Sequence, residues 1–554
     1  MNKIILPLAL LALSQTALAQ QPPTGGGLLP VPAPLAPPRP APEIRIEPRT
    51  GAPDTAADAA QPKIVVENLR ISGAELFAEA ELIRLTGFTQ GAELSLMDLQ
   101  AMAARITEHY RRSGYFAAQA YVPAQEIKDR SVTIAVTEGR LGKVELRNQT
   151  NLADQVALGQ LQGLNTGQVL ATPAIESRLL LLSDLPGVNV KSTLVPGASV
   201  GTSDLIVEVT PGRRVTGSVD IDNAGNRYTG AYRVGATVNV NNPLGLGDVF
   251  TLRGLTSGEG LKYGRASYQL QLGRGQVGVS YSRLDYKLGK EFESLRANGT
   301  ADIASAFGRY PVLRSRNDNV YLQLAVDAKT FEDRVDSVPS VTNRKSKVLM
   351  ASVFGDHRDG FGGGGVNSYV VTWSLGRLDI QTPAALILDA TTARTNGSFS
   401  KLSFSAMRLQ RLGGPFSLYA GVNGQLASKN LDVSEKMQLG GMNAVRAYPE
   451  GETYADQGYV LSLEARMDLP RFAVLPGQMQ LMAFVDTGSV TQNRNPWGAG
   501  DNHRTLSGAG VGLDWAEPGN FLVRASYAHK LGTAVATSSP DRSGRFWVQL
   551  VKYF

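Results

Sequence analysis

The chain has no cysteine, only four histidines, and no long apolar run after its first residues. Without cysteine it can hold no disulfide framework, no catalytic thiol and no thiolate metal site. The histidines are scattered, and none has a partner at the spacing of a zinc motif: His109, His357, His503 and His529. No Ser-His-Asp signature is present either. The sequence therefore predicts no metal, no cofactor and no enzymatic activity.

The excess of positive over negative charge is also small. The formal net charge is +6 over 554 residues, and no block of lysine and arginine stands out. Such a balance is typical of a solvated surface rather than of a nucleic-acid-binding face. The glycine-rich stretch 360–365 lacks the Lys-Ser/Thr pair of a phosphate-binding loop, so it is better explained as a turn.

The amino terminus has the pattern of a secretory signal. Lys3 precedes the mostly apolar run Ile4–Leu13, and Ala17-Leu18-Ala19 forms a small-x-small ending. We therefore predict a cleavable signal peptide at residues 1–19. No later run approaches the ~18 apolar residues of a membrane-spanning helix. A protein that spans a membrane without such helices must do so as a closed barrel, because backbone groups in lipid need partners.

Residues 20–62 are rich in glycine, proline and alanine. They include Gly25-Gly26-Gly27 and the proline-rich run Pro30–Pro42. Such a segment has little to bury and is predicted to be an extended linker. No convincing helix is visible in it.

Two units with mixed helix and strand patterns follow, at residues 63–138 and 139–212. In the first, Ser95 and Asp98 resemble a capping box before a run with one apolar face. The second repeats the order strand, helix, helix, strand, strand, with helices expected at 152–161 and 173–182. Thr172 is expected to cap the later helix, with Pro173 in its first turn.

Residues 213–554 consist of short alternating segments separated by Gly, Asn, Asp and Pro turns. In Tyr459–Leu469 the odd positions are apolar and the even ones mostly polar, as expected for a strand with one face to lipid and one to water. Counting such segments gives 16, the even number that a bacterial barrel requires. The fold class is therefore mainly β: a 16-stranded transmembrane antiparallel barrel preceded by two α+β domains. A soluble all-β fold such as a propeller is the alternative.

Several stretches resemble the two-partner-secretion transporters of Gram-negative bacteria, the hemolysin-activator and filamentous-hemagglutinin transporter type. These are Ser113–Pro123, Leu185–Leu205, Asp222–Gly230 and Asn242–Asp248, in that order. The resemblance covers roughly 64–554 and implies that the two α+β units are POTRA domains, named for polypeptide-transport association. A mid-barrel signature of the family matches Tyr310, Pro311, Arg314 and Ser315.

Two further motifs of this family concern the barrel interior. Val445, Arg446, Ala447 and Tyr448 resemble the tip of the long sixth extracellular loop, with Ala447 where glycine is usual. Phe484, Asp486 and Gly488 resemble a strand motif that faces the lumen. The resemblance implies that the loop folds into the lumen and that Arg446 pairs with Asp486. From the residues alone, an exposed Arg446 and a solvated Asp486 remain an alternative.

The resemblance implies an outer-membrane transporter whose periplasmic POTRA domains capture an unfolded secreted exoprotein, an adhesin or cytolysin, and whose barrel passes it outward. The partners implied are this client, outer-membrane lipid and the barrel assembly machinery, which would recognise the final strand ending at Phe554. We expect a monomer that binds no nucleic acid. An assembly factor (insertase) of the same superfamily and, less favoured, a diffusion porin are the alternatives. Many family members also begin with a helix that plugs the barrel, and residues 20–62 offer no such helix.

Overall fold

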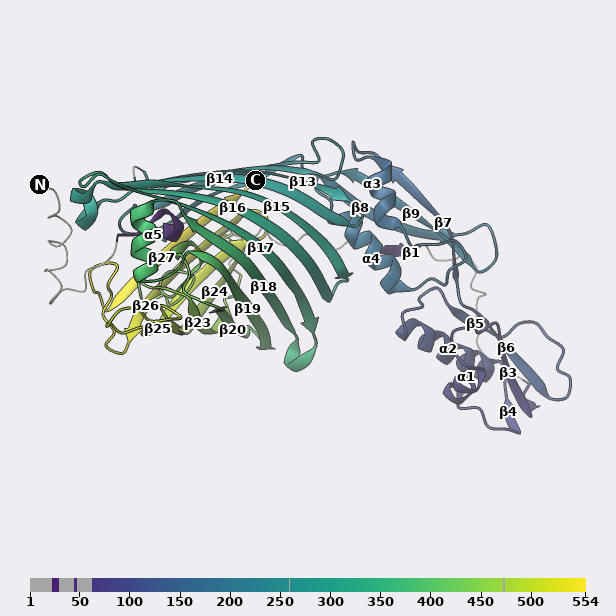
Figure 1. Cartoon of the computed structure of the whole chain (residues 1–554). Helices are drawn as coiled ribbons and strands as arrows, with labels where there is room; N and C mark the ends of the chain where they lie inside the picture. The colour runs from purple at the N-terminus through teal and green to yellow at the C-terminus, as the bar shows by residue number, and fades with distance from the viewer. Residues whose placement is uncertain (1–21, 29–43, 47–61, 259, 472–473) are drawn as a thin grey trace, which may run out of the picture.

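The computed structural model describes residues 22–28, 44–46, 62–258, 260–471 and 474–554. The expected signal peptide, residues 1–19, and most of the proline-rich linker lie outside this range. Figure 1 shows a large barrel with an arm of two small units at one end. Among the described residues no helix is both long and apolar enough to cross a membrane.

The outer unit of the arm packs two helices on small sheets. Its core includes Leu82, Ile106, Tyr110 and Ile134, all fully buried. The Ser95 side chain accepts from the Asp98 amide while Asp98 accepts from the Ser95 amide, which confirms the predicted capping box. The elements are β2 (Ile64–Val66), β3 (Asn68–Ser72), α1 (Glu79–Thr86), β4 (Ala92–Leu94), α2 (Leu96–Arg112), β5 (Gln119–Tyr121) and β6 (Ser131–Thr137).

The inner unit has its own core, with Leu179, Leu182, Leu205 and Val207 at the centre. Its sheet has the order β1-β8-β9-β7, in which a short strand from the linker, β1 (Ile44–Ile46), pairs in parallel with β8. The other elements are β7 (Arg140–Asn148), α3 (Asp154–Leu161), α4 (Thr172–Ser183), β8 (Val188–Pro196) and β9 (Thr202–Pro211).

The expectation that Thr172 caps helix α4 was wrong. The helix begins at Thr172 itself, the cap position is Ala171, and no side chain caps it. The Thr172 hydroxyl instead donates to the Gly114 carbonyl of the outer unit, 3.0 Å away. The hydroxyl therefore joins the two units of the arm instead of satisfying the helix end.

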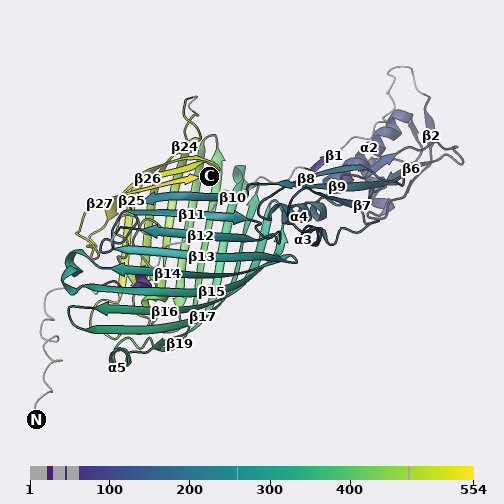
Figure 2. The ribbon, with the colours of Figure 1, turned by 90° about the horizontal axis from the view of Figure 1, so that it is seen from above.

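The barrel is a closed sheet of 16 strands in which each strand pairs with its neighbours in the chain and the last pairs with the first, which confirms the predicted fold class. Figure 2 shows β10–β17 side by side along one wall. The strands are β10 (Val215–Asp222), β11 (Arg233–Asn241), β12 (Val249–Thr256), β13 (Leu261–Leu272), β14 (Gly275–Lys287), β15 (Ala297–Arg314), β16 (Asp318–Val335), β17 (Ser340–Asp359), β18 (Gly365–Ile380), β19 (Gly397–Gly413), β20 (Phe416–Ala427), β23 (Gln457–Asp468), β24 (Gln478–Thr491), β25 (His503–Glu517), β26 (Phe521–Leu531) and β27 (Gly544–Tyr553).

Alternate residues of each strand point to opposite sides of the wall. On β16, Leu322, Leu324 and Val326 are exposed on the outer face, whereas Phe331 is fully buried on the inner face. On β23, Leu461 and Leu463 are exposed on the outer face, and the next residue, Glu464, is buried on the inner face. An apolar outer face with a polar inner face is the pattern of a barrel in lipid.

The barrel closes at its carboxy terminus. Strand β27 pairs with β10, and beyond the strand end the backbone of Phe554 exchanges hydrogen bonds with Gly217. A Cβ on Gly217 would stand 2.5 Å from the Phe554 ring, so glycine leaves the room that the ring occupies. Phe554 therefore belongs to the seam of the barrel.

Strands β15–β18 have 18, 18, 20 and 16 residues, more than the ~10 that span a membrane. Strand β15 runs past Pro311, where the pairing register shifts between Pro311 and Leu313 because proline has no N–H to give the ladder. The amino-terminal segment carries η1 (Gly25–Leu28). The loops between barrel strands carry η2 (Lys290–Leu295), η3 (Phe361–Gly363), α5 (Pro383–Thr391), η4 (Val433–Glu435), β21 (Met437–Gln438) and β22 (Tyr454–Ala455). The glycine-rich stretch 360–365 thus forms the turn between β17 and β18.

Candidate functional site: a loop anchored in the lumen

The segment between β20 and β23, residues 428–456, folds back into the barrel. Its two short strands, β21 and β22, pair with each other, and an isolated bridge joins Gly440 to Val445. The loop tip lies on buried inner-face residues of β23 to β26 in a cluster with Val460, Phe484 and Ala528. We call residues 428–456 the lumen loop. It joins strands at the barrel end opposite the arm, so that end is extracellular if the arm is periplasmic.

Arg446 of the lumen loop meets Asp486 of β24. Its Nε and Nη2 donate to the two carboxylate oxygens at 2.8 Å each, and its backbone N–H donates to Oδ2 at 3.1 Å. Asp486 has a fully buried side chain and also accepts from the Ser462 hydroxyl at 2.9 Å. Two parallel bonds to one carboxylate are the strongest geometry available to arginine.

Other inner-face groups complete the surroundings of Arg446. Its Nη1 lies 2.9 Å from Glu464 of β23, and its guanidinium carbon lies 3.4 Å from the centroid of the Phe484 ring. Its carbonyl accepts from the Trp547 indole N–H at 2.7 Å. The arginine is therefore bound to β23, β24 and β27 at once, and Glu464 is shared with Arg466.

The remaining motif residues pack around this pair. Val445, Ala447 and Tyr448 are fully buried, and the Tyr448 hydroxyl donates to the Ala534 carbonyl at 3.1 Å. A Cβ on Gly488 would stand 2.5 Å from Leu439 of the loop, so this glycine admits the loop. The structure thus brings the two interior motifs together in one cluster.

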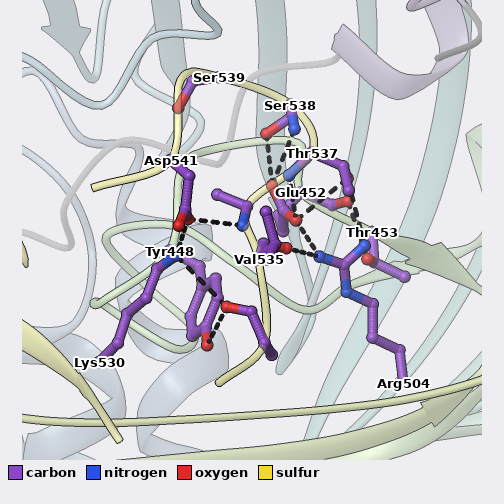
Figure 3. A network of polar contacts seen from close by, with 12 residues as sticks. Tyr448, Glu452, Thr453, Arg504, Lys530, Val535, Thr537, Ser538, Ser539 and Asp541 are labelled. Carbon is purple, nitrogen blue, oxygen red and sulfur yellow. Dashed lines mark hydrogen bonds and ion pairs between the residues drawn. The ribbon is translucent and has the colours of Figure 1, made fainter. Parts of the chain in front are cut away.

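Sequence reasoning missed a second attachment of the lumen loop, at Glu452 (Figure 3). Its carboxylate is fully buried, pairs with Arg504 of β25, and accepts from the amides of Thr537 and Ser538 at 2.8 and 3.0 Å. Thr537 and Ser538 belong to the segment between β26 and β27. Nothing in the local sequence around Glu452 indicates partners that lie 85 residues away.

A third attachment holds the first half of the lumen loop to the opposite wall. Asp432 pairs with Arg344 of β17, which also pairs with Asp333 of β16. Glu435 lies 2.6 Å from Lys329 and 3.0 Å from Lys401. Asp432, Glu435 and Arg344 are buried, and the side chains of Asp333, Lys329 and Lys401 are at most 15% exposed. Sequence reasoning did not single them out.

Residues 22–28 also lie inside the barrel (Figure 1). The Gly25 amide donates to Asp333 at 2.9 Å, and the Tyr454 hydroxyl of the lumen loop donates to the Gly27 carbonyl at 2.8 Å. Leu28 is buried with Tyr228 and Tyr286. The amino-terminal segment therefore contacts both the wall and the lumen loop, although its sequence forms only one short turn of 3₁₀ helix.

The mid-barrel motif lies far from this cluster, at the end of β15 nearest the arm. Arg314 donates from Nε and Nη2 to Asp184 of the inner unit, at 2.7 and 2.9 Å. Ser315 caps the turn to β16 by exchanging bonds with Asp318. Pro311 makes the strand irregularity described above, and Tyr310 is exposed on the outer face. This motif thus attaches the arm to the barrel.

Ion pairs, hydrogen bonds and a buried apolar cluster hold the lumen loop inside the barrel. A closed β-barrel with an α+β arm and a loop fixed in its lumen is the architecture of one class of outer-membrane transporter. Two family models match the chain: haemolysin secretion/activation protein ShlB/FhaC/HecB over residues 201–515, and the ShlB-type POTRA domain over residues 64–139. The chain belongs to this family of two-partner-secretion outer-membrane transporters.

The chain is similar to the heme/hemopexin transporter protein HuxB of Haemophilus influenzae, with 29% identity over 472 residues, 84% of this chain and 82% of the relative. It is 26% identical over 499 residues to the outer membrane transporter CdiB of Escherichia coli O6:K15:H31, covering 86% and 84% of the two chains. The solved structure of CdiB from Escherichia coli matches the fold with a TM-score of 0.68 at 23% identity, covering 92% and 94%.

Proposed function

We propose that this protein receives one secreted partner protein in unfolded form on its periplasmic arm and passes it outward through the barrel lumen. The observation that carries the proposal is the closed barrel whose lumen holds a loop fixed by ion pairs at three places and by an apolar cluster under its tip. A plain diffusion porin would not need the arm.

In this proposal the chain is divided into the expected parts: signal peptide 1–19, linker 20–62, POTRA domains 63–138 and 139–212, and barrel 213–554. Strand edges of the arm are suited to pairing with an extended client. The chain itself supplies an example, because Ile44–Ile46 pairs in parallel with Ser192–Leu194 on the edge of β8. A client strand would either displace Ile44–Ile46 from the edge of β8 or pair with another strand edge of the arm.

In this proposal Arg446 and Asp486 hold the lumen loop in its resting position, with Val445, Ala447, Tyr448, Phe484 and Gly488 shaping the contact. Arg314 and Ser315, with Tyr310 and Pro311, position the arm at the barrel mouth. Phe554 ends the strand by which the assembly machinery would recognise the barrel, and the protein acts as a monomer in lipid. No nucleotide site is needed, since folding of the client outside would bury apolar surface and oppose its return.

A deletion tests the proposal against its nearest alternative. Removing this gene should abolish release of one large secreted protein, encoded beside it, and restoring the gene should restore that release. The levels of other barrel proteins in the outer membrane should not change. A general loss of barrel proteins would instead identify an assembly factor of the same superfamily.

The client itself is the second thing to test. Some relatives carry the name heme/hemopexin transporter protein, which suggests a client concerned with haem for this chain as well. The released protein should then be retained on immobilised hemopexin. Release of a protein with no affinity for hemopexin would leave the transport proposal in place and remove this client class.

A further inference from the structure

A cavity of about 650 Å³ lies between the end of α4 in the arm and the ends of β13–β17 nearest the arm. Five arginines line it, at positions 274, 309, 314, 316 and 358, against only two carboxylates, Asp184 and Asp356. This cavity is far from the lumen loop. In the proposed function, a chain passing from the arm into the barrel would cross this junction.

Several of these arginines have no carboxylate partner. Arg314 pairs with Asp184, and Arg316 pairs with Glu176 of α4. Within the described ranges, Arg274, Arg309 and Arg358 form no ion pair. The Arg309 guanidinium donates to Gln276 and lies 5.8 Å from the centroid of the Tyr321 ring. Among the residues described, the cavity thus holds three arginines without an ion pair against one carboxylate without one, Asp356, which accepts a hydrogen bond from Asn319.

A neighbouring arginine increases this imbalance. Burial and the nearby charge of Arg274 lower the pKa of Arg178 on α4. In the described part of the chain, Nη1 of Arg178 and Nε of Arg274 are buried without a hydrogen-bond partner. Buried donors without acceptors are costly, so a carboxylate that entered beside Arg274, which lines the cavity, would offset part of that cost.

We propose that this cavity binds the carboxylate side chains of an extended polypeptide on its way from the arm into the barrel. The inference rests on the proposed function and names the chemistry that the barrel mouth selects. Arginine matches a carboxylate through two parallel bonds, and Asp184 against Arg314 already displays that geometry in the cavity wall. Acidic residues of the client would meet Arg274, Arg309 and Arg358 in the same way.

The orientation of Arg309 favours a polypeptide over a lipid headgroup, although a lipid phosphate is also an oxyanion and the Arg274 guanidinium lies 5.8 Å from the centroid of the Tyr310 ring, on the outer face. Arg309 is opposite Gln323 of β16, on the inner face. The residues that flank Gln323, Leu322 and Leu324, are exposed on the outer face. The unpaired Arg309 therefore faces the lumen, where a client passes, rather than the bilayer.

The test uses the full chain in detergent and two labelled peptides, one of alternating glutamate and serine and one with glutamine for each glutamate. Fluorescence anisotropy should show preferential binding of the acidic peptide, weakening as salt is added. The double variant R274Q/R309Q should bind it about tenfold more weakly. Arg283→Gln, on β14 and outside both the arm and the cavity, is the control and should bind like the parent chain.

The proposal is overturned if both peptides bind alike or if R274Q/R309Q retains full affinity for the acidic one. Binding of phosphatidylglycerol vesicles that the acidic peptide cannot displace would also overturn it, in favour of a lipid site. Should R274Q/R309Q fail the heat-modifiability test for a folded barrel, R358Q replaces it. Normal release of the partner protein with no peptide preference would reject this inference and keep the proposed function. Preferential binding of the acidic peptide without any release of the partner protein would keep this inference and reject the proposed function.

Discussion

Ala447 of the lumen loop occupies the space that Gly508 of β25 leaves open. A Cβ on Gly508 would stand 2.4 Å from the Cβ of Ala447, closer than two side-chain atoms can approach. The alanine that departs from the usual family pattern is thus matched by a glycine on the facing strand. The fit of these two residues determines how deeply the loop tip is seated.

Gly508→Ala should displace the loop tip and reduce release of the partner protein, since overpacking a buried contact costs ~1–3 kcal/mol. Adding Ala447→Gly should restore part of the release, because the remaining neighbour is the His529 carbonyl at 3.1 Å. Ala447→Gly alone should be close to the parent chain. Immunoblots of culture medium measure the release. Equal release by Gly508→Ala and the parent would refute the packing argument.

Arg446→Ala should abolish release while the barrel stays folded and heat-modifiable in the membrane. Removing one partner of a buried ion pair leaves the other charge unpaired, at a cost of ~3–5 kcal/mol. Arg446→Lys should also fail, because an ammonium cannot form two parallel bonds to Asp486.

The control for these variants is Arg283→Ala. Arg283 pairs with Asp285 and Asp302 on the surface, where about half of its side chain is exposed. Exposed pairs contribute ~0–1 kcal/mol, so release should be unchanged. Normal release by Arg446→Ala would contradict the role assigned to the pair.

Glu452→Gln should loosen the contact between the lumen loop and the segment between β26 and β27. The buried carboxylate accepts from Arg504, Thr537 and Ser538, and a neutral amide would leave the arginine unpaired. Proteases added to whole cells should then cut residues 532–543 faster than in the parent. Asp541→Asn is the comparison, since the Asp541 side chain is about half exposed, and it should have a smaller effect. Equal cutting rates in all three proteins would refute the attachment.

The capping box of α2 should make the outer unit of the arm sensitive to acid. Hydrogen bonds from Ser95 lower the pKa of Asp98 below its ordinary value. A carboxyl whose pKa is lower in the folded state stabilises the fold above its unfolded pKa, ~3.9, and loses that contribution as pH falls through the folded pKa. Hydrogen exchange of α2 amides should therefore differ between the parent and Asp98→Asn at neutral pH. The difference should shrink toward pH 3, and a constant difference would contradict the linkage.

The sequence was sufficient for the barrel because lipid imposes a two-residue period on every strand. Leu461, Leu463 and Glu464 follow that period, and so do their exposures. The Arg446–Asp486 contact could be anticipated only through the family resemblance, since the two residues lie 40 positions apart. Lumen-facing charges are common, so their positions alone do not identify partners.

Other contacts of the site have no local signal at all. Glu452 accepts a hydrogen bond from Thr537, which lies 85 residues further along the chain, and Gly25 donates one to Asp333, which lies 308 residues away. A glycine-rich segment has no apolar period, so its place in the lumen depends on backbone hydrogen bonds that the wall and the lumen loop supply. Likewise, Arg314 meets Asp184 only because the arm folds against the barrel mouth.

The most direct test of transport through the lumen is photocrosslinking in cells that express the partner protein with a tightly folded domain at its trailing end, so that it stalls. The crosslinker is placed at Gln323, on the inner face of β16, or at the adjacent Leu324, which is 62% exposed on the outer face. Passage through the lumen predicts strong crosslinks to the stalled protein from position 323 and none from 324. Crosslinks from 324 alone, or from neither position while release is blocked, would contradict passage through the barrel.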